Sequence, residues 1–391
     1  MTADRQTNRF LFLYALACAG GAVAYVPFLS ILLPVKVSAL AGQGSDATWI
    51  AYMAFAGAVV ASLGGIGFGY LSDITLNRRG WTGLGLILSS AMLLAVSQAD
   101  GLISLLALVV GWQICLNLML APLTAWAADC IPDAKRGLLG GLLAFAPAMG
   151  ALAGALITSS SSVSPDGRLG LVVLIVIACV LPVLIVGGPQ PVKEKEVREP
   201  AEAALGTLSA TQAMWISRLF VQVAQAALFS FLFFWLRSIE STVNDWQTAS
   251  VFGAIQIGSV PLALMVGRWA DRNRSPRIAL IGCALLASLA LIAMALAKVL
   301  PLAIAAYGLF GFATSVFLAL HSAHTLTVLP RADRRARDLG LFNLTNTLPS
   351  LIMPWLTLAL VPQFGFSGLF VLLSLLALSA GLVLGAVGRR F

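Results

Sequence analysis

Two histidines are the side chains of this sequence best suited to exchange a proton. His321 and His324 lie three positions apart inside a long apolar segment, and imidazole is the side chain that ordinarily titrates around neutral pH. No Asp or Glu falls in the middle of such a segment, and Asp129, at the end of one, is the third candidate. Proton exchange would therefore depend on His321, His324 or Asp129.

A second group of polar side chains occurs at helical spacing within other apolar segments. Gln113 and Asn117 are four positions apart, so on a helix they share one face. Further pairs, three positions apart, occur among the full set of candidates for binding a polar solute: Tyr25, Gln113, Asn117, Gln222, Gln225, Gln256, His321, Asn343 and Asn346. Such stripes either line a cavity or form hydrogen bonds between helices, and for the set as a whole we favour a cavity.

The composition of these stripes predicts the kind of solute. Amides, together with the rings of Trp112, Trp126 and Trp235, suit an uncharged polyhydroxylated or amphiphilic molecule. A strongly anionic solute would require a buried Arg or Lys. Arg218 is the nearest candidate, but the sequence places it in the first turns of its segment.

Neither catalysis nor metal binding is predicted. Only two histidines are present, and the HExxH, GxSxG and P-loop patterns are all missing from the sequence. The five cysteines are widely spaced and form no CxxC pair, so neither a zinc site nor a disulfide framework is indicated. We expect no enzyme activity, no metal and no cofactor.

The overall composition explains where these polar residues must lie. Apolar residues make up 59% of the chain and charged residues 10%, against about 45–50% and about 25% in soluble domains. The excess apolar surface must face lipid, so the first predicted partner is a bilayer. The net charge of +8 is divided among short clusters between apolar segments, which indicates membrane topology and not nucleic-acid binding.

Twelve stretches are long and apolar enough to cross a bilayer as helices. The predicted domains are a six-helix bundle over 1–188, a charged and proline-bearing linker over 189–211, and a second six-helix bundle over 212–391. The stretches lie near 10–33, 48–70, 82–99, 102–127, 138–159, 169–188, 212–236, 247–269, 278–297, 300–327, 339–361 and 367–388.

The basic residues alternate between the connecting loops. With the N-terminus inside the cell, 20 of the 24 Lys and Arg residues fall on the inside, and only Lys36, Arg168, Arg237 and Lys298 fall outside. Because Lys and Arg are enriched in cytoplasmic loops, this division predicts an even number of crossings and two cytoplasmic termini.

Two pairs of loops reveal an internal repeat. Asp73 follows the second stretch and Asp271 the eighth, 198 positions later; Pro132 follows the fourth stretch and Pro330 the tenth, again 198 positions later. Two loops that share one offset predict halves related as parallel repeats, about an axis along the membrane normal.

The first of these loops resembles the signature of the major facilitator superfamily, a Gly-x-Leu-small-Asp stretch followed by basic residues. The resemblance implies that the fold is an all-α membrane protein of twelve helices, with solute bound between two halves that alternate in access. It also implies a gating role for both copies of the signature and the loop after the fourth stretch: Gly69, Asp73, Arg78, Arg79, Arg136, Gly267, Asp271, Arg272 and Arg274.

Physical chemistry gives these residues a role of its own. Asp73 and Asp271 lie at the ends of helices, where a carboxylate opposes the negative end of the helix dipole. Each is favourable only beside a cation or the start of another helix, and such a contact can latch the cytoplasmic side; alternatively, the loops are only topology signals and caps. Gly69 and Gly267 allow a neighbouring helix to approach closely.

Local features favour two branches of this superfamily. The run from Arg337 to Pro349 resembles sugar carriers related to sucrose transporters and to glycoside–pentoside–hexuronide symporters, although no aspartate lies in the second stretch, as sodium coupling would require. The run from Ala146 to Gly154 distantly resembles drug/proton antiporters. We therefore expect a monomeric carrier of a sugar or glycoside in a bacterial inner membrane, either proton-coupled or an uncoupled facilitator. An exporter of drugs or amphiphilic metabolites is the alternative.

Overall fold

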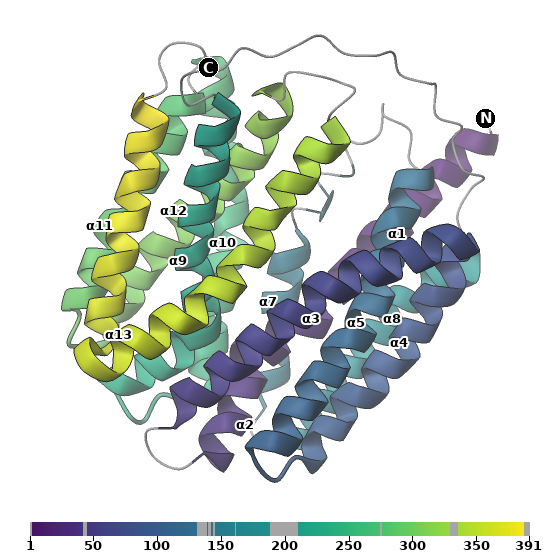
Figure 1. The fold of residues 1–391 in the computed structure, drawn as a ribbon, viewed down its shortest axis with the longest axis horizontal. Coiled ribbons are helices and arrows are strands. Elements are labelled where there is room, and N and C mark those ends of the chain that lie inside the picture. Colours follow the sequence, from purple (N-terminus) through teal and green to yellow (C-terminus); the bar gives the residue numbers. More distant parts are fainter. Residues whose placement is uncertain are drawn as a thin grey trace. The chain divides into compact units, whose positions relative to one another are not determined.

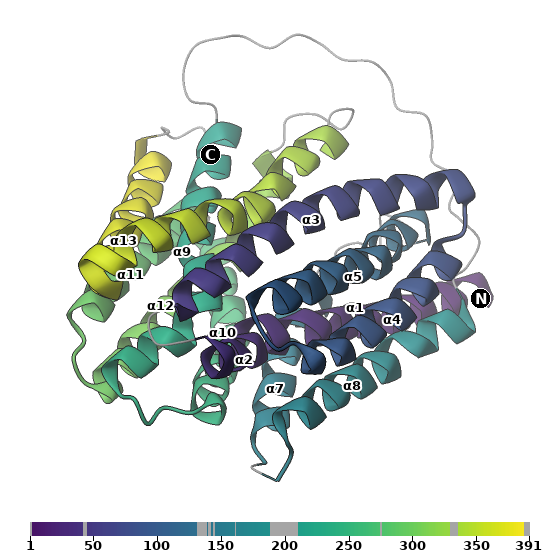
Figure 2. The ribbon, with the colours of Figure 1, turned by 60° about the horizontal axis from the view of Figure 1, so that its bottom comes forward.

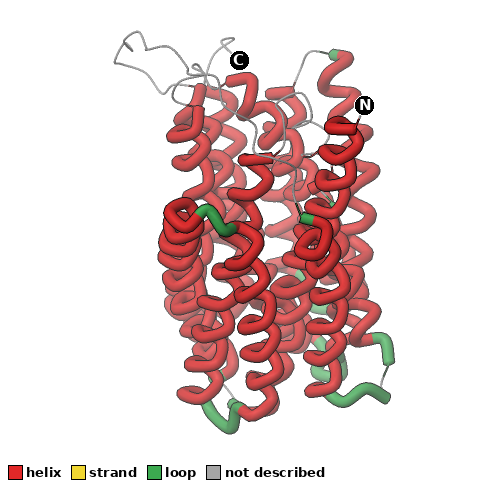
Figure 3. The backbone as a smooth tube through the Cα atoms, turned by 90° about the vertical axis from the view of Figure 1, so that its right-hand side faces the viewer, coloured by secondary structure: helices red, strands yellow, loops and turns green. Residues whose placement is uncertain are grey.

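The structure, a computed structural model, is helical in every element that it describes (Figure 3). The chain divides into two compact units. The first unit combines Met1–Glu194 with Asn244–Gly253, and the second combines Lys195–Val243 with Ala254–Phe391. The described residues are 2–41, 45–130, 139, 142–143, 145–160, 162–187, 210–273, 276–328 and 335–386.

The first unit contains the helices that follow from the first six apolar stretches. Its first crossing is longer than predicted, because α1 (Thr2–Pro27) continues through a π-helical turn (Phe28–Leu32) into α2 (Leu33–Leu40). Pro27 lies at the end of α1, directly before this turn. A proline inside a membrane helix is tolerated where such a local adjustment satisfies the backbone groups that the proline leaves without a partner. The remaining helices are α3 (Asp46–Thr75), α4 (Arg78–Ala95), α5 (Leu102–Cys130), α7 (Ala146–Thr158) and α8 (Pro165–Val186).

The second unit contains the later helices. The longest element, α13, is broken at Gly365, whose φ of 63° is left-handed and therefore suits glycine; the chain turns back on itself within α13 (Figure 1). The first residues of α10, Asp245–Gly253, belong to the first unit. The helices are α9 (Ala210–Ile239), α10 (Asp245–Arg272), α11 (Pro276–Leu296), α12 (Leu300–Val328) and α13 (Arg335–Ala386).

These helices confirm the predicted fold class. Among the described residues, ten helices are long and apolar enough to cross a membrane, and α7 is a shorter apolar helix. Both the eleventh and the twelfth predicted stretch lie within α13, on either side of its break. The predicted linker lies almost wholly outside the described residues, so the predicted domain boundaries stay a prediction.

The internal repeat is visible in the helix bounds. Helix α5 runs from Leu102 to Cys130 and α12 from Leu300 to Val328, so both ends are offset by 198 positions. Packing follows the same pattern: α4 lies against α5 and α8 in the first unit, and α11 lies against α12 and α13 in the second (Figures 1 and 2). In the second unit α9 also packs on α12 and α13, which brings the polar residues of these three helices together.

Candidate functional site

The loop after α3 forms a network of charges around one arginine. Helix α3 ends at Thr75, Leu76 takes a left-handed φ of 51°, and the Asn77 side chain caps α4 by accepting a hydrogen bond from the Gly80 amide. This short turn places Arg78 at the start of α4. Its Nη2 lies 2.5 Å from Asp73 Oδ1, its Nε donates to Asp129 Oδ2 over 2.9 Å, and its Nη1 donates to the Ser72 hydroxyl over 2.6 Å.

The network answers the electrostatic problem posed by the sequence. Asp73 and Asp129 lie near the carboxyl ends of α3 and α5, where the helix dipole disfavours negative charge. Arg78, only 13% exposed, compensates both carboxylates. The expectation that Asp73 needs a neighbouring cation is met, and the contact joins three helices of the first unit. Whether it gates transport stays a prediction.

The other gating candidates differ in their surroundings. Arg79 Nη2 donates to the Ile185 carbonyl at the end of α8, where a cation is favourable. A Cβ added to Gly69 would meet no described atom within 4 Å, and at Gly267 it would make only ordinary contact with Leu320. Whether these two glycines permit close helix packing stays a prediction; within the first unit Gly85 does so, because a Cβ there would lie 2.3 Å from the Met119 nitrogen.

The second copy of the signature is described only in part. Arg272 is exposed at the end of α10. Arg136 and Arg274 lie outside the described residues, as does the side chain of Asp271. The predicted second latch therefore stays a prediction.

The second unit contains a polar cluster centred on Arg218 of α9. Arg218 Nη1 donates to the Ser322 hydroxyl of α12 over 2.9 Å and lies 3.5 Å from His321 Nδ1. Its Nη2 donates to Asn346 Oδ1 of α13 over 3.3 Å, and Gln222 Nε2 donates to the same oxygen over 2.6 Å. The cluster unites three residues that the sequence proposed separately, Gln222, His321 and Asn346, with Arg218.

Hydrogen-bond partners define the state of His321. Its Nε2 lies 2.8 Å from the Met214 carbonyl oxygen, which can only accept, so Nε2 carries a hydrogen. Nδ1 faces a guanidinium group, which can only donate. The imidazole is thus neutral in this arrangement, and it is fully buried. His324, one turn along the helix and beyond the span, is half-buried, and burial lowers the pKa of its imidazole below the ordinary 6.5.

The remaining solute-binding candidates do not join this cluster. Asn117 donates to the Gln113 backbone carbonyl of its own helix, and Gln113 Oε1 is buried with no hydrogen-bond partner among the described residues. Gln256 accepts a hydrogen bond from Ser315. Tyr25 and Gln225 are half-buried on α1 and α9, and the side chain of Asn343 lies outside the described residues.

The three tryptophans expected beside these amides are core residues. Trp112 packs edge-on against Phe28 and Trp235 edge-on against Phe370, whereas the ring of Trp126 is tilted against that of Phe10; each tryptophan is less than 10% exposed. Each ring therefore stabilises its own unit, and the prediction that these rings surround a solute is wrong.

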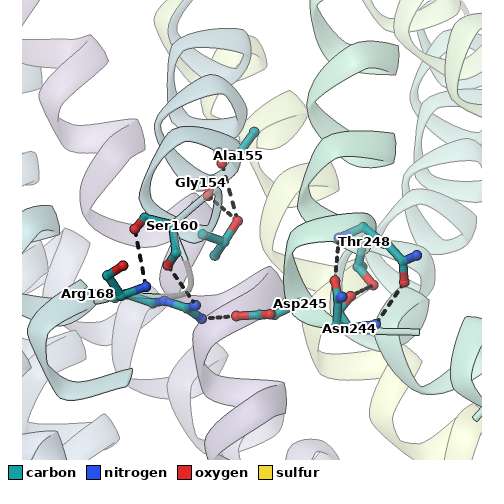
Figure 4. A network of polar contacts seen from close by, with 10 residues as sticks. Gly154, Ala155, Ser160, Arg168, Asn244, Asp245 and Thr248 are labelled. Atoms are coloured by element: carbon teal, nitrogen blue, oxygen red, sulfur yellow. Dashed lines mark hydrogen bonds and ion pairs between the residues drawn. The ribbon is translucent and has the colours of Figure 1, made fainter. Parts of the chain in front are cut away.

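A second arginine network in the first unit was not predicted. Arg168 of α8 forms an ion pair with Asp245 at the start of α10 and also donates to the Ser160 carbonyl (Figure 4). Both charged side chains are largely buried, at 10% and 16% exposure. Asn244 and Gln247 cap each other at the start of α10 by reciprocal hydrogen bonds. The sequence did indicate that this ion pair could form, since Arg168 and Asp245 carry opposite charges and are predicted for the same side of the membrane.

Sequence spacing also contained a signal for the cluster of the second unit. Arg218 and Gln222 are four positions apart and share a helix face, but on this helix only Gln222 and Gln225 were proposed from the sequence as solute-binding candidates. Ser322, beside His321, was missed because a lone serine in an apolar helix has no distinguishing pattern.

Comparisons with known proteins agree with this architecture. The sequence model of the Major Facilitator Superfamily matches residues 10–297 and 247–390, whereas no curated protein matches the sequence. The fold is similar to that of a bacterial homolog of the human lysosomal transporter Spinster. Its inward-facing occupied form gives a TM-score of 0.75 at 16% identity, covering 99% of this chain and 97% of that one. Its inward-facing unoccupied form gives 0.69 at 16% identity, covering 98% and 95%.

A human protein shares the same fold. The structure of the human organic anion transporter MFSD10 (TETRAN) gives a TM-score of 0.69 at 15% identity, covering 98% of this chain and all of that one. At such low identity the likeness concerns the fold alone.

Proposed function

Because the chain belongs to the Major Facilitator Superfamily and is a transporter, we propose that it moves a small polar solute across a bilayer by alternating access. The observation that carries this proposal is the cluster of Arg218, Gln222, Ser322 and Asn346. All four residues lie in segments apolar enough to span a membrane, where polar side chains are costly and face a water-filled path or another helix.

A sugar or glycoside is the first solute class to test. Hydroxyl groups pair well with the amides of Gln222 and Asn346 and the hydroxyl of Ser322, because each of these side chains can both donate and accept. The run from Arg337 to Pro349, which resembles sugar carriers, supports the same class. Of the similar structures, one belongs to an organic anion transporter, which makes acidic solutes the second class to test.

Proton coupling through His321, His324 or Asp129 stays part of the proposal, with an uncoupled facilitator as the alternative. Asp129 is engaged by Arg78 and His321 by Met214, so His324 is the member of the three that we favour as the titrating group. We propose a plasma-membrane location with both termini cytoplasmic, from the distribution of Lys and Arg.

The export of drugs is the less favoured function. The small residues of α7, which resemble an antiporter motif, pack against α1: a Cβ added to Gly150 would lie 2.9 Å from the Ala22 carbonyl oxygen. Close helix packing therefore accounts for at least one of these glycines.

Uptake into proteoliposomes tests the proposal. The purified protein would be reconstituted, and entry of radiolabelled hexoses, glycosides, sugar acids and hydrophobic cations measured with and without pH and sodium gradients. We expect saturable entry of at least one polar solute, absent from protein-free liposomes. Entry of hydrophobic cations alone would favour the exporter, and no flux of any solute would contradict the proposal.

A further inference from the structure

We propose that Arg218 binds an oxyanion of the transported solute, a carboxylate or a phosphate, with Ser322 and Asn346 flanking it. The inference rests on the proposed function and deepens it, because it names the chemical class of the solute. It also revises the expectation of an uncharged solute, which depended on the lack of a buried cation.

The charge of Arg218 is the first observation. The side chain is half-buried in the span Gln212–Ile239, and among the described residues no carboxylate lies within ion-pair distance of it. Its partners are a serine hydroxyl, an amide oxygen and an imidazole nitrogen, all neutral. A guanidinium within a membrane span is costly, so a site that leaves its charge uncompensated is suited to an anionic ligand.

The unused donors of the guanidinium are the second observation. Nε is buried and has no hydrogen-bond partner among the described residues, which is costly for a charged donor. Among the residues that the structure describes, Nη2 makes only the contact of 3.3 Å with Asn346. Nε and Nη2 together form one edge of the guanidinium, which matches the two oxygens of a carboxylate or phosphate. An oxyanion on this edge would satisfy both groups.

The arrangement of the partners gives the cluster one exposed side. The cluster is closed on one side by His321 and Met214, both fully buried, and open on the other, where Ser322 and Asn346 are exposed. Asn346 Oδ1, the acceptor on the Nη2 side, is also held by Gln222. A solute oxygen would displace it from Arg218, and the Gln222 amide would keep Asn346 beside the site.

Ligand-induced stabilisation in detergent tests this site without depending on transport. The probes are matched neutral and anionic pairs: glucose with glucuronate and with glucose 6-phosphate, and octanol with octanoate and with octyl phosphate. We expect the anionic member of at least one pair to raise the unfolding temperature and the neutral member not to do so. The carboxylate and phosphate arms identify which oxyanion is bound.

Variants assign the effect to Arg218. Arg218→Gln should remove the anion-induced shift, and Arg218→Lys, which keeps the charge but not the planar fork, should weaken apparent affinity by at least tenfold. Arg237→Gln is the matched control, because Arg237 lies on the same helix, stacked 5.3 Å over the Phe233 ring and away from the cluster. Asn346→Ala keeps Arg218 intact and serves if Arg218→Gln fails to fold; removing the competing acceptor should tighten anion binding.

Several outcomes would overturn the inference. These are equal stabilisation by the neutral and anionic members of every pair, no stabilisation by any probe, or an anion effect that survives Arg218→Gln. Failure of the proposed function has a different signature. It would be anion binding that depends on Arg218 in a protein that moves no solute in proteoliposomes.

Discussion

Two arginines of the first unit, Arg78 and Arg168, and one of the second, Arg218, are partnered differently. In the first unit, Arg78 meets Asp73 and Asp129, and Arg168 meets Asp245. In the second unit, the partners of Arg218 within the described part of the chain are only Ser322, His321 and Asn346. A compensated arginine fixes the positions of the helices it joins, whereas an arginine with neutral partners keeps its charge for a ligand. The contrast separates structural from solute-binding charges without reference to sequence motifs.

The strongest test of this contrast is removal of Arg78. Arg78→Gln would leave two carboxylates near the carboxyl ends of α3 and α5 without their cation, and breaking such a pair is costly. Water screens Asp73, which is 58% exposed, and this limits the effect. We therefore expect the free energy of unfolding to fall by about 2–3 kcal/mol. Unfolding of the reconstituted protein in denaturing detergent measures it.

The control for this prediction is Arg218→Gln. It should cost less stability than Arg78→Gln, since it removes an uncompensated charge and leaves neutral groups behind. Equal losses in the two variants, or a stabilised Arg78→Gln, would contradict the assignment of Arg78 to structure.

The second test is a double-mutant cycle on Arg168 and Asp245. Each single neutralisation, Arg168→Gln or Asp245→Asn, should destabilise by leaving one largely buried charge alone, and the double variant should recover part of the loss. We expect a coupling energy of about 1–2 kcal/mol, within the range for residues in direct contact. Additive effects would show that the ion pair contributes nothing to holding the start of α10.

The third test separates the two carboxylates that share Arg78. Asp73→Asn should lower stability by about 1 kcal/mol or less, because the exposed carboxylate is screened, and Asp129→Asn should lower it more. We nevertheless expect Asp73→Asn to reduce solute flux with membrane insertion intact, because it weakens the predicted latch. Flux equal to that of the unmodified protein would leave Asp73 as a helix-end charge only.

The sequence was sufficient for the helices and their repeat, because apolarity and the placement of Lys and Arg are properties of segments. Helix α12 begins at Leu300, where the predicted stretch begins. Helical spacing also identified faces correctly, since Gln222 and Asn346 do lie on polar faces. It could not show which faces meet: Arg218 and Asn346 are 128 positions apart, and only packing of α9 against α13 joins them.

Misassigned residues share one physical cause. The three tryptophans were interpreted from residue type, yet their role depends on what lies opposite. A glycine matters for packing only where a backbone approaches it, as Met119 approaches Gly85, and a tryptophan is core or lining according to whether a ring such as Phe28 covers it. The sequence does not encode that neighbour locally.

The smallest expected effect concerns titration in the second unit. Burial lowers the pKa of His324 below the ordinary 6.5, so at neutral pH the imidazole is uncharged and protonation occurs only as pH falls below that value. If His324 exchanges the proton, the response of solute uptake to an inward pH gradient should have its midpoint below pH 6.5. His324→Gln should abolish that response. His321→Gln tests the neighbouring histidine. Because the partners of His321 hold the imidazole neutral, solute uptake by the His321→Gln variant should still respond to the pH gradient. An unchanged response in the double variant would transfer the coupling to Asp129, where the compensated arginine network of the first unit, and not the second unit, would then sense the proton.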